Sequence, residues 1–161
     1  MTAFPLMFTF RDAVSGNGFL AGVTLSGRAL MVCENGEWWM YGVRPGAISE
    51  TGETPQETFL RFRNAYRAIL FDIAEEAVDF DSFKKEAERF YQEPDNEEEG
   101  RWIEAFQAIR SGKVEAEAPF SSLQKIAPET RPTQMTVECL NAQGARFTPA
   151  DNVPDLYCRA A

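Results

Sequence analysis

The clearest pattern of apolar and polar residues begins at Thr54. Apolar side chains follow it at steps of three and four, which is the spacing of one face of an α-helix. They are Phe59, Phe62, Tyr66, Ile69, Leu70, Ile73 and Ala77. Thr54 is a suitable N-cap, Pro55 fits the first helical position, and Glu57 can bond back to the Thr54 amide as a capping box. The pattern therefore predicts a long amphipathic helix that ends near Val78.

The residues before this helix have the patterns of β-strands. Residues 4–10 place large apolar side chains at even positions, which is the two-residue period of a strand. Residues 15–18 have the composition of a turn, and residues 19–25 predict a second strand. Ser26-Gly27 then favours a tight reversal into a further strand at 29–33.

Asn35-Gly36 separates that run from an aromatic segment at 38–41. The dipeptide supplies the positive φ values of a type I′ turn, so it predicts a β-hairpin. Trp38 and Trp39 point to opposite faces of a regular strand. At least one is expected in the core, and the other is either covered by later helices or exposed as a contact residue. Residues 47–53 are predicted to form a loop.

Two shorter helices are predicted after the long one. Asp79 or Asp81 can cap the first, which extends through the apolar positions of residues 83–91. The second is predicted at about residues 97–111, with Gly112 suited to the position just past its end.

Residues 113–161 contain five prolines, which interrupt any long amphipathic helix there. A short strand is predicted at 135–140, and residues 145–148 are candidates to pair with it. Leu156 and Tyr157 give the last residues an apolar pair that can dock on the same domain or on a neighbour.

Together these elements predict an α+β fold. An antiparallel meander of three to four N-terminal strands is packed by the long helix, two further helices follow, and a short hairpin or extended tail ends the chain. Residues 1–112 are expected to form one domain with a helical extension. Residues 113–161 form a proline-broken segment with a short hairpin and a docking tail.

The net charge of −9 is concentrated in one part of the chain. Residues 49–100 hold fifteen acidic and six basic side chains, whereas residues 1–48 hold three of each and residues 101–161 hold seven of each. A surface of this kind repels phosphate and attracts basic partners. The alternative interpretation is a solvated acidic helical region that aids solubility.

The composition excludes several chemistries. The chain has no histidine, which removes the common forms of Ser-His-Asp and Cys-His catalysis and of zinc binding. Cys33, Cys139 and Cys158 lie far apart, so buried or free thiols are expected and not a disulfide framework. No apolar run reaches about 18 residues and no basic signal-peptide start is present, so a cytoplasmic protein without a membrane segment is expected.

A strand end, Val43-Arg44-Pro45-Gly46-Ala47-Ile48, is followed by Gly52-Glu53-Thr54 and by the helix start Pro55-Gln56-Glu57-Thr58-Phe59. With residues 4–11 and Gly18-Phe19-Leu20, this part of the chain resembles the HicB-like antitoxin family. The resemblance implies an α+β domain that binds and neutralises a small basic RNA-cleaving toxin. Such antitoxins often add a C-terminal DNA-binding motif, but residues 113–161 lack a basic recognition helix, which argues against DNA binding here.

We therefore expect an acidic binding protein that sequesters a basic protein partner, such as the toxin of a toxin–antitoxin pair. No enzymatic activity, cofactor or metal is expected. Electrostatic steering would make the association fast and sensitive to salt. The residues expected to contact the partner are Trp38, Glu75, Glu76, Asp79, Glu97, Glu98, Leu156 and Tyr157.

Two other functions stay open from the sequence. A structural or phage-related protein would assemble with itself through its sheet edge or its tail, and a homodimer would fit this function. A carboxylate metal-dependent hydrolase would use the acidic set Glu75, Glu76, Asp79 and Asp81. Within that set, Glu75 and Asp79 are four residues apart and would converge on one helix face.

Overall fold

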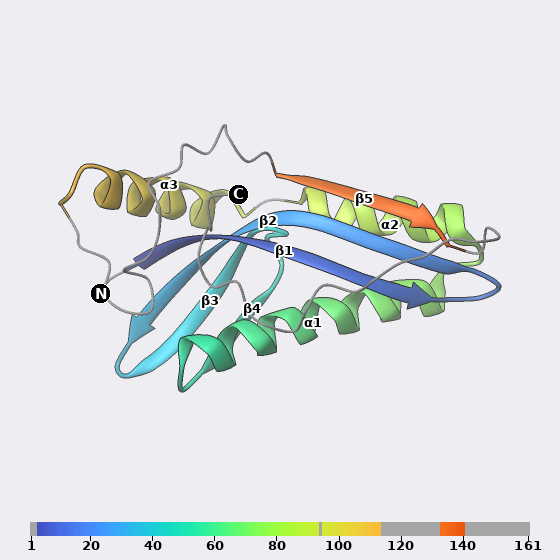
Figure 1. Ribbon diagram of the computed structural model, residues 1–161, viewed down its shortest axis with the longest axis horizontal. Coiled ribbons are helices and arrows are strands. Elements are labelled where there is room, and N and C mark those ends of the chain that lie inside the picture. Colours follow the sequence, from blue (N-terminus) through green and yellow to red (C-terminus); the bar gives the residue numbers. More distant parts are fainter. Residues whose placement is uncertain (1–2, 94, 114–132, 141–161) are drawn as a thin grey trace.

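The computed structural model describes residues 3–93, 95–113 and 133–140, and it has the predicted α+β fold (Figure 1). An antiparallel sheet curls between helices, and a short strand joins it from the C-terminal part of the chain. The elements in chain order are β1 (Ala3–Ser15), β2 (Leu20–Glu34), β3 (Glu37–Arg44), β4 (Ser49–Gly52), α1 (Pro55–Glu76), α2 (Phe80–Gln92), α3 (Asn96–Arg110) and β5 (Gln134–Cys139).

Strand β2 is the centre of the sheet. Its whole length pairs with β1, from Leu20 opposite Ser15 to Val32 opposite Ala3. Its other edge is shared by two strands, because β3 pairs with residues 28–34 and β5 pairs with residues 21–26. Strand β4 adds to the far side of β3.

Two parts of the strand prediction are wrong. Ser26-Gly27 does not reverse the chain, and residues 20–34 form one continuous strand. Gly27 is needed for close packing instead, since a Cβ there would lie 2.6 Å from the Arg44 carbonyl oxygen and 2.6 Å from the Phe8 ring. Residues 49–52 of the predicted loop form β4, whose partner is β3.

The Asn35-Gly36 turn is confirmed. Asn35 has a φ of 53° and Gly36 a φ of 83°, the left-handed values that a type I′ turn requires. Trp38 and Trp39 take opposite faces, as predicted. Trp38 is half-buried against the main core, and the Trp39 ring stacks on Tyr41 with centroids 6.0 Å apart.

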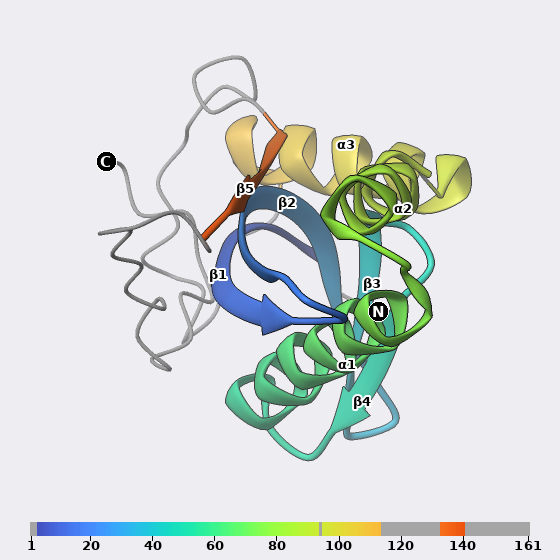
Figure 2. The ribbon, with the colours of Figure 1, turned by 90° about the vertical axis from the view of Figure 1, so that its right-hand side faces the viewer.

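The sheet curls, as the end-on view in Figure 2 shows, and apolar side chains are buried on both of its faces. On one face, the even positions of β1 and the odd positions of β2 pack against α1 and α2. On the other face, Met7, Leu30 and Val32 pack against Trp102 of α3. The Trp102 indole donates a hydrogen bond to the Leu6 carbonyl, 3.0 Å away. The helices thus form two layers with the sheet between them.

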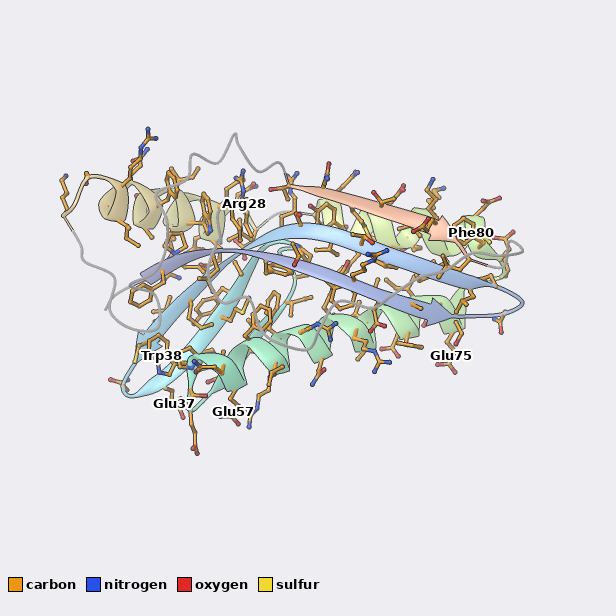
Figure 3. The ribbon with its side chains drawn as sticks, viewed as in Figure 1. Arg28, Glu37, Trp38, Glu57, Glu75 and Phe80 are labelled. Carbon is orange, nitrogen blue, oxygen red and sulfur yellow. The ribbon has the colours of Figure 1, made fainter. Side chains whose placement is uncertain are left out.

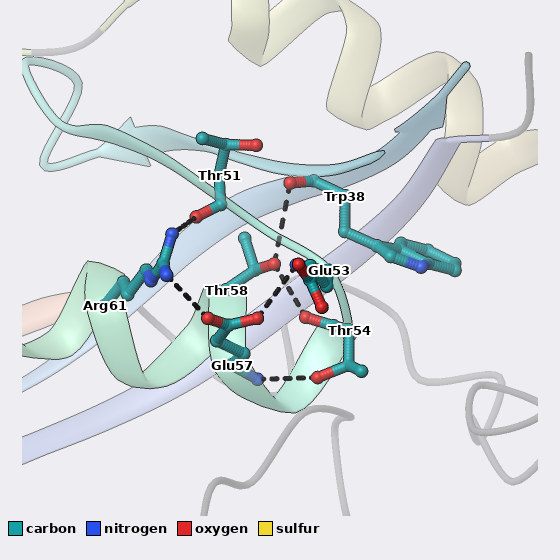
Figure 4. A network of polar contacts seen from close by, with 7 residues as sticks. All are labelled: Trp38, Thr51, Glu53, Thr54, Glu57, Thr58 and Arg61. Atoms are coloured by element: carbon teal, nitrogen blue, oxygen red, sulfur yellow. Dashed lines mark hydrogen bonds and ion pairs between the residues drawn. The ribbon is translucent and has the colours of Figure 1, made fainter. Parts of the chain in front are cut away.

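The start of α1 is fixed by the polar network in Figure 4. Thr54 Oγ1 accepts from the Glu57 amide at 3.1 Å, which confirms the N-cap. The Glu57 carboxylate bonds back to the Glu53 amide at 2.9 Å, one residue before the predicted Thr54 amide. Arg61 completes the network through a 2.6 Å ion pair with Glu57 and a bond to the Thr51 carbonyl of β4. The cap therefore ties α1 to the sheet edge.

Asp79, one of the two predicted candidates, caps α2. Helix α3 is capped by Asp95, which accepts from the Glu97 and Glu98 amides and was not predicted as a cap. Gly112 follows the end of α3 with a φ of 76°, as predicted. The strand predicted at 135–140 is confirmed as β5, but its partner is β2, and residues 145–148 lie outside the described residues.

Two buried tyrosines give a matched test of this packing. The Tyr91 hydroxyl donates to the Ser26 carbonyl at 2.6 Å, whereas the Tyr66 hydroxyl has no hydrogen-bond partner among the described residues. We expect Tyr91→Phe to lower the free energy of unfolding by about 1 kcal/mol, because it leaves a backbone carbonyl unsatisfied. Tyr66→Phe should be neutral or slightly stabilising. Urea unfolding measures both, and equal losses would contradict the assignment.

Candidate functional site

The junction between α1 and α2 gathers acidic side chains at one end of the molecule (Figure 3, where Glu75 and Phe80 mark it). We call this surface the acidic corner. It consists of Asp72, Glu75, Glu76, Val78, Asp79 and Asp81. All six side chains are exposed, and Val78 is 80% exposed despite being apolar. Single exposed apolar side chains are common on protein surfaces, so the distinctive feature of this corner is its cluster of exposed carboxylates.

The end of α1 is held in place by the β1–β2 turn. The Asn17 side-chain amide donates to the carbonyl of Glu75 at 3.2 Å and to that of Ala77 at 3.1 Å. These bonds satisfy carbonyl groups that the last turn of a helix otherwise leaves without partners. Asn17 therefore fixes the backbone that carries Glu75 and Glu76, while their side chains remain in solvent.

The start of α2 is fixed by Asp79. Its Oδ1 atom accepts from the Ser82 amide at 2.8 Å and from the Ser82 hydroxyl at 2.7 Å. These hydrogen bonds favour the charged carboxylate, so they hold the pKa of Asp79 below its usual value. Asp79 thus has a structural task as well as a place in the acidic corner.

The carboxylates of the acidic corner are not neutralised by ion pairs within the described residues. Some acids elsewhere are paired, such as Glu57 with Arg61 and both Glu86 and Glu93 with Arg89. The last turn of α1 holds no basic residue, although Glu75 and Glu76 lie there against the negative end of the helix dipole. This arrangement is electrostatically unfavourable for the helix itself, so folding alone does not explain it.

The predicted contact residues do not form one surface. Glu75, Glu76 and Asp79 come together in the acidic corner. Trp38 lies near Glu37 at the opposite end of the long axis (Figure 3), where it contacts Phe4 with ring centroids 6.2 Å apart.

The remaining predicted contacts lie elsewhere. Glu97 and Glu98 start α3, which covers the other face of the sheet. Glu97 is exposed, but Glu98 is largely buried in an ion pair with Arg101, at 2.9 Å. Leu156 and Tyr157 lie outside the described residues.

Two features of the structure were not anticipated from sequence. Val78 is exposed because it lies in the short link between the end of α1 and the start of α2. Arg28 and Arg44 face each other across β2 and β3, at the end of their pairing. The second feature had no signal in the sequence, because it depends on strand register.

One geometric expectation of the metal-dependent alternative, the convergence of Glu75 and Asp79, is wrong. Helix α1 ends at Glu76, so Glu75 and Asp79 do not lie on one helix face, contrary to the expectation. Over the described part of the chain, no group of three or more Cys, Asp or Glu side chains is placed to hold a metal ion. Cys33 is a half-buried free thiol, in line with the prediction for it.

The fold and the site define an α+β protein with a curled five-stranded sheet and an exposed acidic surface at one helix junction. Comparison with family models, curated proteins and solved structures gave no match to this chain. No helix within the described residues is long and apolar enough to cross a lipid bilayer.

The cap at Asp79 gives a pH-dependent prediction. We expect Asp79→Ala to lower the melting temperature at neutral pH, because the Ser82 amide loses its acceptor. Since the folded-state pKa is depressed, the contribution is present above the unfolded value near 3.8 and is lost as the pH falls through the folded value. Thermal unfolding between about pH 7 and about pH 2 should show the variant and the parent converging at the acidic end.

Asp81→Ala is the matched control for that experiment. Asp81 lies in the first turn of the same helix but accepts no capping hydrogen bond among the described residues. It should have a smaller effect at neutral pH. If Asp79→Ala and Asp81→Ala behaved alike, the cap would not be the cause.

The unfavourable charge at the end of α1 gives a second prediction. Glu75→Gln and Glu76→Gln should each raise the free energy of unfolding, by about 0.3–1 kcal/mol at low ionic strength. The control is Glu97→Gln with Glu99→Gln in the first turn of α3, where negative charge suits the dipole and its loss should destabilise. Urea unfolding at low and high salt measures both, and the same sign for the two helix ends would contradict the argument.

Proposed function

We propose that this chain is an acidic binding protein that sequesters a basic protein partner. The observation that carries the proposal is the acidic corner, whose carboxylates are exposed, unpaired among the described residues and held on two fixed helix ends. Glu75 and Glu76 oppose the dipole of their own helix, so their placement is better explained by a partner than by stability.

Rigidity supports the proposal as well. Asn17 and Ser82 fix the backbone on both sides of Val78, so association would not have to order this segment. Basic side chains of a partner could then pair with the carboxylates at the rim while Val78 enters an apolar site between them. Charged rims around an apolar centre are the usual arrangement of protein interfaces.

We further propose that the partner is a small basic toxin, as the resemblance of residues 4–77 to HicB-like antitoxins implies. In support, residues 4–77 form the four strands β1 to β4 and then α1, and the Thr54 cap connects the sheet to the helix. On α2, the basic residues Lys84 and Arg89 are paired with Glu88 and Glu86, which leaves that helix little free positive charge for DNA. The proposed action is therefore sequestration of a protein and not repression at an operator.

The test is affinity capture from the source organism at low salt, comparing the parent protein with Glu75→Gln/Glu76→Gln. We expect the parent to retain a small basic protein and the variant to retain it about tenfold less, because rim charges speed association and oppose wrong partners. The captured protein is then assayed for RNA cleavage alone and with the parent protein added. Inhibition by the parent protein is the expected outcome.

The matched control is Glu86→Gln/Glu93→Gln, which makes the same change in net charge where both acids are paired with Arg89. It should leave capture unchanged. Equal losses in the two double variants would assign binding to net charge alone, and no basic protein at any ionic strength would contradict the proposal. Light scattering of the isolated protein separates it from self-assembly, which predicts an oligomer without any partner.

A further inference from the structure

A cavity lies where β3 and β5 meet end to end along β2. Strand β3 ends with Arg44 opposite Arg28, and β5 begins with Gln134 opposite Ser26, so Gly27 between them has no partner on that edge. Helix α2 covers the gap through Tyr91, whose hydroxyl donates to the Ser26 carbonyl at 2.6 Å. The resulting cavity is about 450 Å³ in volume and open to solvent on one side.

The wall of this cavity is rich in hydrogen-bond donors. It includes Arg44, Tyr91, Gln92, Thr133, Gln134 and Met135. The Thr133 hydroxyl is buried and has no hydrogen-bond partner among the described residues. Buried polar groups normally have partners, so a hydroxyl of this kind marks a place where one is missing. Met135 and the Tyr91 ring add apolar surface beside these donors.

Arg44 lines the cavity, and the charge of Arg28 on the neighbouring strand also acts on Tyr91 in the cavity wall. Arg28 and Arg44 are register partners where the β2–β3 pairing becomes irregular, so two positively charged residues are neighbours on adjacent strands. Within the described residues, neither forms an ion pair with a carboxylate. The Arg28 guanidinium instead lies 4.8 Å from the centre of the Trp102 ring, and its Nε is buried without a partner.

The cavity wall also contains one carboxylate. Glu88 lines the cavity together with Arg44, but its ion pair is with Lys84 of its own helix, at 3.8 Å. Burial raises the pKa of Tyr91 to about 12, although the charges of Arg44 and Arg28 act in the opposite direction. Tyr91 is therefore protonated at neutral pH and brings no negative charge.

We propose that this cavity binds a small organic molecule through an oxyanion, either a carboxylate or a phosphate group. Arg44 is the main ligand because it lines the cavity, and its guanidinium can hold two oxygens at once. Arg28 supplies a second positive charge beside it. Thr133 and the two glutamine amides complete the set of donors. A volume of about 450 Å³ exceeds the needs of the oxyanion alone, so an organic group would occupy the space beside Met135 and Tyr91.

This inference does not depend on the acidic corner or on the proposed partner. The cavity is on the α2–β5 side of β2, and its residues are separate from those that form the corner. Each proposal can therefore fail without the other.

The test uses phenyl phosphate and benzoate as probes of the intact protein, titrated at constant ionic strength with chloride as the balancing ion. Heat of binding and Trp102 fluorescence are the readouts, since Arg28 covers that indole. We expect saturable one-to-one binding of at least one probe with a Kd of about 1 mM or tighter. Binding of phenyl phosphate alone would assign a phosphate ligand, binding of benzoate alone a carboxylate ligand, and binding of both the shared oxyanion chemistry.

The key variant is Arg44→Met, with Arg63→Met on α1 as a control for the same loss of charge. Arg44→Met should weaken probe binding about tenfold or more through the lost charge-assisted bonds, while Arg63→Met should not. Without probe, Arg44→Met should melt no lower than the parent, because the variant relieves repulsion with Arg28. Absence of saturable binding, equal loss in Arg63→Met, or a lower melting temperature of unliganded Arg44→Met would overturn the proposal.

Discussion

The structure depends on pairing both edges of one long strand. β2 spans residues 20–34, and its backbone N–H and C=O groups need hydrogen-bond partners on both edges. β1 does so along one whole edge, whereas the other edge needs β3 for one half and β5 for the other. β5 comes from residues far along the chain, so the sheet connects the N-terminal meander with the C-terminal part of the sequence.

The arrangement on β2 also places the helices. A curled sheet buries both faces, and each face requires its own cover. Helices α1 and α2 cover the face formed by Phe8, Phe10 and their neighbours, and α3 covers the face around Leu30. Because α1 and α2 lie on the same face, the chain has to turn sharply between them. That turn exposes Val78 and brings the acids of two helix ends together.

The two proposed sites share a physical logic. In each, like charges are held close together by a backbone that is fixed for other reasons, and they form no ion pair within the described residues. At the acidic corner, Asn17 and the Asp79 cap hold the backbone. At the cavity, the register of β2 with β3 holds Arg28 opposite Arg44. Repulsion between like charges is unfavourable in the isolated protein. A ligand or partner of opposite charge would remove that repulsion, which explains why such an arrangement is kept.

The sequence by itself determined the local elements, because their signals are contacts between residues close in the chain. Thr54, Asn35-Gly36 and Gly112 specify a cap, a turn and a helix end through their own backbone preferences, and all three appear as predicted. The concentration of charge in residues 49–100 was likewise visible without coordinates. Tertiary structure alone decided that Gly27 continues a strand, since its role is to admit the Phe8 ring and the Arg44 carbonyl. It alone also paired β5 with β2 and set Arg28 opposite Arg44, because strand register is fixed by packing between residues distant in the chain.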